Sequence, residues 1–242
     1  MKIKEKLKLD CAGLIAHGPI TIVAFGDSVT HGALYFDEID YDTVYHRLLA
    51  KKISAVRNYV PVNVVNAGIG GLTAVQSLER MDAQVFAHNP DLVIIAFGLN
   101  DVNRTLEEYV GSLRTMFEKC LARDIETVFL TPNMLNTYVA DDLPKMYHEY
   151  ASKMANFQNN GRMDTYIDAA RALAHSMGVK VADCYAKWRE LSKTQDTTVL
   201  LANRINHPTR EMHELFADTL FDVIFDDEKS MNTAVEETMY RE

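Results

Sequence analysis

Five short apolar runs, each followed by a segment with helical periodicity, limit the folds open to this chain. Residues 92–97 form an uninterrupted apolar run, which is typical of a central strand covered on both faces. Parallel strands need helical crossovers, so the alternation predicts an open parallel sheet with helices on both sides. The expected fold class is α/β, a three-layer α/β/α sandwich in a single domain over residues 1–242. The expected strands cover roughly residues 20–25, 62–65, 92–97, 127–130 and 179–182.

The helical segments carry apolar residues three or four positions apart. The clearest of them starts with a capping-box pair, Thr105 and Glu108. Residues 1–18 are expected to be a charged lead-in, as a short strand or loop, and the acidic tail 227–242 is expected to be peripheral and frayed. The expected helices cover about residues 44–56, 74–87, 106–121, 163–177 and 209–225, with a further one that ends near residues 159–161.

The composition excludes several classes of protein. The 242-residue chain has a formal net charge of −9, which argues against a nucleic-acid partner because phosphates need clustered Lys and Arg. Cys11, Cys120 and Cys184 are widely spaced without a CxxC pair, so neither a disulfide framework nor a zinc site is expected. The histidines show no HExxH spacing, and we expect no metal and no cofactor. The pattern contains no apolar leader or spanning segment, which predicts a cytoplasmic protein without membrane insertion.

Four polar or glycine-rich segments lie where a parallel sheet would bind a ligand. Ser28 follows the first expected strand, residues 68–71 follow the second, and Asn100 follows the third. His207 lies in the last loop before the final helix. Ligands of open α/β sheets bind outside the carboxyl ends of the strands. We therefore expect these four segments to converge on one site.

A serine and a histidine at such an edge are suited to acyl transfer. A serine hydroxyl is a weak nucleophile until a base removes its proton, and His207 is a suitable base because imidazole titrates near neutrality. The tetrahedral intermediate needs preorganised hydrogen-bond donors, each worth about 3–4 kcal/mol. The glycine turn and the Asn100 amide can supply them. Thr73 breaks the GxGxxG spacing of a dinucleotide site, and no phosphate loop supports a nucleotide-binding flavodoxin-like protein.

These segments resemble the four sequence blocks of the SGNH hydrolases, the GDSL esterase/lipase superfamily, over about residues 20–225. The resemblance implies a flavodoxin-like fold with a five-stranded parallel sheet in the order 2-1-3-4-5. The GxSxG elbow of the α/β-hydrolase fold is absent, because Thr30 stands in place of its second glycine. The matching blocks are Gly26-Asp27-Ser28, Gly71 within residues 68–71, Gly98-Leu99-Asn100-Asp101, and Asn206-His207-Pro208.

The resemblance also implies a role for each matching residue. Ser28 is the expected nucleophile, and its backbone N–H is an oxyanion donor. Gly71 supplies the second oxyanion donor and the Asn100 side chain the third. His207 is the expected base.

One position departs from the family pattern. The family usually has an Asp three residues before the histidine, and here that position is Arg204. A carboxylate normally fixes the tautomer of the imidazole and stabilises the imidazolium. We therefore expect a Ser28–His207 dyad in which either the Asn203 side chain or a main-chain carbonyl orients His207. Arg204 is expected either to depress the pKa of His207 or to bind an anionic part of the substrate.

The resemblance implies a metal-independent serine ester hydrolase that forms an acyl-enzyme on Ser28. The setting of residues 205–208 is similar to that of carbohydrate O-acetylesterases, so the expected reaction removes a small acyl (acetyl) group from a carbohydrate or similar small ester. A lysophospholipase or thioesterase is the nearest alternative. A non-catalytic binding protein on the same fold is the alternative from another class, since the usual Asp is missing. Residues 133–144 and 31–42 are expected to line the pocket, and the sequence carries no signal for an oligomeric state.

Overall fold

A computed structural model describes residues 1–239 of the backbone and the side chains of residues 1–225. Five parallel strands form one sheet in the order β2-β1-β3-β4-β5, so the predicted strand order is confirmed. The strands are β1 (Ile20–Gly26), β2 (Val62–Gly68), β3 (Leu92–Ala96), β4 (Glu126–Leu130) and β5 (Lys180–Ala182).

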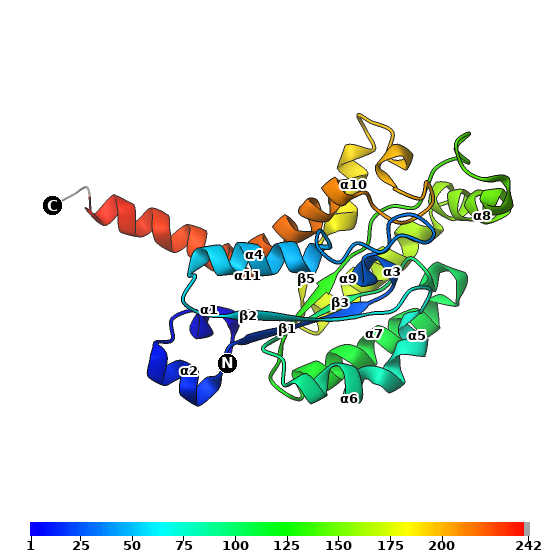
Figure 1. The fold of residues 1–242 in the computed structure, drawn as a ribbon. Helices are drawn as coiled ribbons and strands as arrows, with labels where there is room; N and C mark the ends of the chain where they lie inside the picture. The colour runs from blue at the N-terminus through cyan, green and yellow to red at the C-terminus, as the bar shows by residue number, and fades with distance from the viewer. Residues whose placement is uncertain (240–242) are drawn as a thin grey trace.

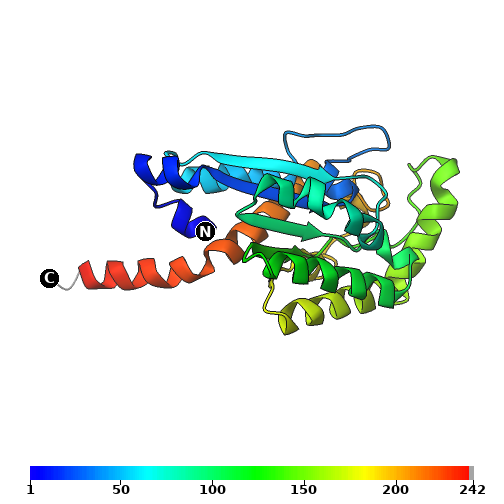
Figure 2. The same ribbon diagram turned by 90° about the horizontal axis from the view of Figure 1, so that it is seen from below.

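Helices cover both faces of this sheet, which confirms the three-layer α/β/α sandwich (Figures 1 and 2). One face is covered by α4 (Tyr45–Val56) and α11 (Arg210–Met239). The other face is covered by α5 (Ala74–Ser77), α6 (Met81–Gln84), α7 (Leu106–Leu121) and α9 (Arg162–Ser176). The remaining helices are α1 (Ile3–Lys6), α2 (Cys11–His17), α3 (Ser28–His31), α8 (His148–Asn159) and α10 (Cys184–Leu191).

The alternation of side chains along a strand explains this double cover. In β1, Ile22 and Ala24 pack into the core beneath α4 and α11, whereas Val23 and Phe25 pack into the core beneath α7 and α9. All four side chains are fully buried. A strand whose side chains are buried on both faces therefore needs helices on both sides of the sheet.

Three expected elements differ from those observed. The helix expected over residues 74–87 is divided into α5 and α6 by a 3₁₀ turn at Leu78–Arg80 and ends in a second one at Phe86–His88. The first turn directs Arg80 toward the ends of two strands, where its guanidinium donates to the carbonyl oxygens of Ala67 and Gly26. These tertiary contacts outweigh the continuous helical pattern of the segment.

The lead-in 1–18 is not a strand or loop but forms α1 and α2. Lys6 is buried and places its Nζ 2.8 Å from Asp91 Oδ2 and 2.8 Å from the Pro19 carbonyl oxygen. Burial of an ammonium group requires such partners, and they attach the segment to the start of β1.

The last helix, α11, continues to Met239 instead of ending near residue 225. The expectation that the tail 227–242 is peripheral and frayed stays a prediction, because the side chains of these residues lie outside the described part of the structure. Within residues 1–239, no helix combines the length and the apolar character that a membrane span requires.

Candidate active site

Ser28 lies at the carboxyl end of β1, as the first residue of α3, and its side chain is almost fully buried. Asp27 precedes it and accepts a hydrogen bond from the Val29 N–H at 3.0 Å, which caps α3. Burial raises the pKa of Asp27 to about 7, and the nearby Asp101 adds to this effect. The serine is therefore held at a fixed helix start and not on a mobile loop.

The end of β2 lies against α3 so closely that only glycine fits. A Cβ on Gly68 would lie 2.3 Å from the His31 backbone nitrogen, well below a van der Waals contact. The glycine turn that follows lies beside the serine, since a Cβ on Gly70 would be 3.8 Å from Ser28 Cβ. Gly71 has a φ of +78°, a conformation that a residue with a Cβ adopts only under strain.

Two consecutive residues after β3 hold this glycine turn in place. Asn100 donates from Nδ2 to the Leu72 carbonyl oxygen at 3.0 Å. Asp101 accepts from the Ala74 N–H at 2.8 Å and so caps α5. The structure thus brings Ser28, Gly71 and Asn100 to one edge of the sheet, as the sequence predicted.

His207 completes this group from the loop before α11. Its Nε2 lies 3.0 Å from Ser28 Oγ, and its Nδ1 lies 3.0 Å from the main-chain carbonyl oxygen of Leu34. A carbonyl oxygen only accepts hydrogen bonds, so Nδ1 carries the proton and donates it to Leu34. Nε2 is then free to accept the Ser28 hydroxyl proton, which is the tautomer that a general base needs.

Of the two predicted ways to orient His207, the structure shows the main-chain carbonyl. Asn203 does not contact Nδ1, which corrects the interpretation of its side chain as the orienting group. Its Oδ1 instead accepts from the backbone N–H groups of Ile205, Asn206 and His207, at 2.9–3.0 Å. Asn203 therefore shapes the turn that carries the histidine, and its effect on the imidazole is indirect.

Arg204 is engaged elsewhere. Its Nε lies 3.0 Å from Asp142 Oδ2, and its NH1 donates to the Val199 carbonyl oxygen at 2.8 Å. Burial is the main cause that lowers the pKa of His207 to about 4, and the hydrogen bond to Leu34 partly opposes it. The structure therefore does not support the expectation that Arg204 lowers the pKa of His207.

Ser28 and His207 open into a cavity of about 360 Å³. The predicted segment 31–42 lines it through His31, Ala33, Phe36 and Ile39. The segment 133–144 does not line it, which corrects that expectation, because residues 142–144 face a smaller cavity beside Arg204. The aromatic wall comes from three side chains of two segments, with the rings of Phe36 and Tyr147 stacked 3.7 Å apart and Tyr150 nearby.

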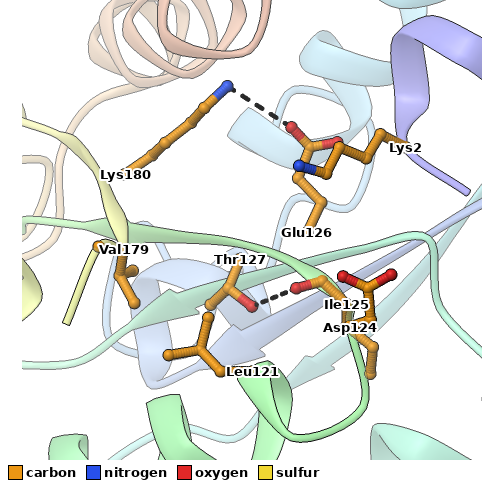
Figure 3. A pocket seen from close by; sticks show the side chains of 9 residues that line it. Lys2, Leu121, Asp124, Ile125, Glu126, Thr127, Val179 and Lys180 are labelled. Atoms are coloured by element: carbon orange, nitrogen blue, oxygen red, sulfur yellow. Dashed lines mark hydrogen bonds and ion pairs between the residues drawn. The ribbon is translucent and has the colours of Figure 1, made fainter.

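A second hollow lies at the opposite end of the sheet, at the start of β4 and β5 (Figure 3). Its main polar feature is an ion pair between Glu126 and Lys180, with the side chain of Lys2 close by. Ligands of open parallel sheets bind outside the carboxyl ends of the strands, so this hollow at the amino ends is not the candidate active site. In the part of the chain with described side chains, no three His, Cys, Asp or Glu residues gather in a way that could hold a metal ion.

Comparison with known proteins agrees with this geometry. The profile of the GDSL-like Lipase/Acylhydrolase family matches residues 24–215, which include Ser28, Gly71, Asn100 and His207. The chain belongs to this family. Its members are acyl-ester hydrolases, so the predicted enzyme class, a carboxylic ester hydrolase, is confirmed.

Individual relatives of this GDSL-family chain are distant. An acetylxylan esterase of Geobacillus stearothermophilus is 26% identical over 189 residues, which cover 72% of this chain and 78% of that protein. The uncharacterized lipoprotein YqeF of Bacillus subtilis (strain 168) is 34% identical over 90 residues, 37% of this chain and 35% of that protein. The cytoplasmic location of the present protein stays a prediction.

Solved structures share the fold. Axe2, an acetylxylan esterase from Geobacillus stearothermophilus, superposes with a TM-score of 0.66 at 23% identity, covering 85% of this chain and 94% of Axe2. LAE5, an alpha/beta hydrolase enzyme from the metagenome of Lake Arreo in Spain, gives 0.65 at 23% identity over the same shares of the two chains.

Several residues of the site have no signal in the sequence. Leu34 acts through its main-chain carbonyl, which every residue carries, so its side chain gives no indication of this contact. Tyr147 and Tyr150 lie just beyond the segment that was expected to line the pocket. Their positions depend on the path of the chain into α8, which the periodicity of residues 145–159 does not determine.

We predict that Asn203→Ala loosens the turn that carries His207. Three backbone N–H groups, two of them buried, lose their acceptor, so the free energy of unfolding falls by about 1–3 kcal/mol. We expect kcat to fall about tenfold, because the imidazole is less well placed. Asn203→Asp is the comparison variant: it keeps an acceptor oxygen there but loses the Nδ2 donor to Asn206 Oδ1, so its stability and kcat should lie between those of Asn203→Ala and the wild type. Urea unfolding and steady-state kinetics of both variants test this. An Asn203→Ala protein with wild-type stability and kcat contradicts it.

Proposed function

We propose that this protein is a serine esterase in which Ser28 and His207 form a catalytic dyad. The observation that supports it most is the pair of contacts on one imidazole, Nε2 to Ser28 Oγ and Nδ1 to the Leu34 carbonyl oxygen, each 3.0 Å long. A histidine that only capped α11 would not require both of these side-chain contacts. The same contacts argue against a non-catalytic binding protein, for which a paired serine and histidine have no use.

The dyad acts in two half-reactions. His207 Nε2 takes the proton of Ser28 Oγ while Oγ forms a bond to the ester carbonyl carbon, which leaves a negative charge on the former carbonyl oxygen. The backbone N–H groups of Ser28 and Gly71 and one N–H of the Asn100 amide stabilise that charge. The intermediate collapses as the C–O bond to the alcohol breaks and Nε2 protonates the leaving oxygen. Water then attacks the acyl-enzyme by the same route and releases the acid and Ser28.

Asn100 can serve this role although it already donates to Leu72. Its amide nitrogen carries two N–H bonds, and the Leu72 carbonyl oxygen uses one of them. The existing bond fixes the plane of the amide, so the second N–H has a defined direction before the substrate arrives. Preorganisation of this kind is what distinguishes an oxyanion donor from an ordinary polar side chain.

The main-chain orienter distinguishes the proposed dyad from the set of residues in Axe2. Axe2 variants described as catalytic mutants replace a serine, a histidine and an aspartate, the last two being three positions apart. The residue three positions before His207 is Arg204, whose guanidinium pairs with Asp142. We infer that the Leu34 carbonyl takes over the orientation of the imidazole, although as a neutral group it offsets less of the imidazolium charge.

A small acyl group, with acetyl as the first candidate, on a carbohydrate or similar small ester is the proposed substrate. The match to an acetylxylan esterase supports this class of substrate, as do the aromatic rings of the cavity, since the apolar face of a sugar ring packs well on an aromatic face. A lipolytic or thioesterase activity on longer acyl chains is the second candidate. It is favoured by Phe36, Ile39 and Tyr150, which line the cavity and remain exposed at its mouth.

We predict a burst of p-nitrophenol when the protein hydrolyses p-nitrophenyl acetate, because an acyl-enzyme on Ser28 forms faster than it breaks down. Ser28→Ala should abolish the burst and lower the rate by several orders of magnitude. Butyrate and octanoate esters measured alongside distinguish the two substrate classes by the preferred chain length. Hydrolysis that persists in Ser28→Ala, or a wild-type protein inactive on all three esters, contradicts the serine mechanism.

We predict that activity extends to unusually acidic pH. The base must be neutral, and burial lowers the pKa of His207 to about 4 from its ordinary value of 6.5, so kcat/KM should fall only as the pH drops through about 4. Burial also raises the pKa of Asp27 to about 7 and that of Asp101 to about 6, and both lie near Ser28. Asp27→Asn and Asp101→Asn variants should each keep the limb near pH 4. A limb between pH 6 and 7 in the wild type and in both variants contradicts this account.

A further inference from the structure

We propose that Arg210 is a positioning residue that holds the Leu34 carbonyl against His207. This inference rests on the proposed dyad, because it assigns the support of the group that orients its base. Three observations lead to it: the construction of the loop that carries Leu34, the contacts of the Arg210 guanidinium, and the position of Arg210 three residues after His207.

Leu34 lies in a short hairpin formed by residues 32–40. Its N–H donates to the Glu38 carbonyl oxygen at 2.9 Å, and the Asp40 N–H donates to the Gly32 carbonyl oxygen at 2.8 Å. The Leu34 carbonyl oxygen accepts from His207 Nδ1 at 3.0 Å. Any movement of Glu38 or Asp40 is transmitted to the carbonyl through these two backbone hydrogen bonds.

Arg210 binds both of these residues through their side chains. Its Nε donates to Asp40 Oδ2 at 2.6 Å, and its NH2 forms a short contact with Glu38 Oε1. Arg210 is the first residue of α11, in the segment that also carries His207. One guanidinium thus connects the segment of the base with the returning arm of the hairpin, residues 38–40, which is hydrogen-bonded to the arm that carries the orienting carbonyl.

The chemistry of the guanidinium suits this task. It is planar, stays charged at every relevant pH, and can bind two acceptors in fixed directions at once. Asp40 remains ionised as its partner, since hydrogen bonds from Thr43 and Arg210 hold its pKa well below its usual range. The bonds to Thr43 also attach Asp40 to the segment just before α4. The carboxylate that Arg210 binds is therefore itself held in place.

A neutral orienting group makes such support important. A carboxylate attracts an imidazolium over a distance, whereas a carbonyl acts mainly through a short hydrogen bond, which weakens steeply when its geometry changes. Buried Ala33 and Leu34 already give the hairpin part of its position, and the Ala33 N–H donates to the Ser28 carbonyl oxygen at 2.9 Å. Loss of Arg210 should therefore misplace the carbonyl slightly and leave the hairpin in place.

The test compares Arg210→Ala and Arg210→Lys with a matched control. Lys52→Ala is that control, because Lys52 also pairs with two carboxylates at the surface of α11, Glu214 and Asp218, without touching the hairpin. We expect kcat of Arg210→Ala to fall about tenfold at unchanged KM, less than the ~100-fold that a full ångström of misplacement costs. Arg210→Lys should recover only part of the loss, because an ammonium group lacks the planar fork that binds both carboxylates, and Lys52→Ala should keep the wild-type kcat.

A second measurement does not depend on turnover. The nitrogen-15 resonances of His207, assigned with a His207→Gln variant, report which ring nitrogen carries the proton. We expect a single Nδ1–H form in the wild type and in Lys52→Ala, and a mixture with the Nε2–H form in Arg210→Ala. A purely structural role for Arg210 would lower stability without changing this tautomer.

The outcomes separate the two proposals. If the wild type shows no Ser28-dependent hydrolysis, the proposed function fails, while the tautomer measurement still tests the role of Arg210. If the wild type is active but Arg210→Ala keeps its kcat and its single tautomer, the inference about Arg210 is overturned. An equal loss of kcat in Lys52→Ala overturns it as well, because that loss would reflect general surface charge.

Discussion

The hydrogen bond from His207 Nδ1 to the Leu34 carbonyl oxygen determines what the rest of this site can do. It fixes the proton on Nδ1 and leaves Nε2 as an acceptor 3.0 Å from Ser28 Oγ. The Asn203 turn sets the position of the imidazole from one side. The hairpin 32–40, connected to α11 by Arg210, sets the position of the carbonyl from the other. Ser28 itself lies where β1 ends and α3 begins, and its carbonyl oxygen accepts from the Ala33 N–H of the hairpin.

A neutral carbonyl in place of a carboxylate changes the pKa of His207 more than the position of its imidazole. A carboxylate partner raises the pKa of a histidine and stabilises its protonated form, whereas here burial dominates and the pKa falls to about 4. Such a base accepts a proton less strongly near neutrality, but it remains unprotonated in acid. In the proposed mechanism the oxyanion donors therefore carry a larger part of transition-state stabilisation, which fits the hydrogen bonds that hold Asn100 and the glycine turn before substrate binds.

The parts of the structure that follow from side-chain patterns could be predicted. Apolar runs and helical stripes predict the sheet and its layers, and parallel strands bring Ser28, Gly71 and Asn100 to one edge. The role of Leu34 could not be predicted, because a main-chain carbonyl depends on the path of the loop and has no residue signature. The division of α5 from α6 and the helices of residues 1–18 depend on the contacts of Arg80 and Lys6 with distant backbone groups. The aromatic wall at Tyr147 and Tyr150 likewise depends on tertiary packing.

Covalent labelling of Ser28 tests the central claim without assuming a natural substrate. Diethyl p-nitrophenyl phosphate phosphorylates an activated serine and releases p-nitrophenol, and intact-protein and peptide mass spectrometry locate the adduct. The account predicts one diethylphosphoryl group per chain on Ser28, with a labelling rate that collapses in His207→Ala. Labelling at another residue, no labelling, or an unchanged rate in His207→Ala would contradict the Ser28–His207 dyad.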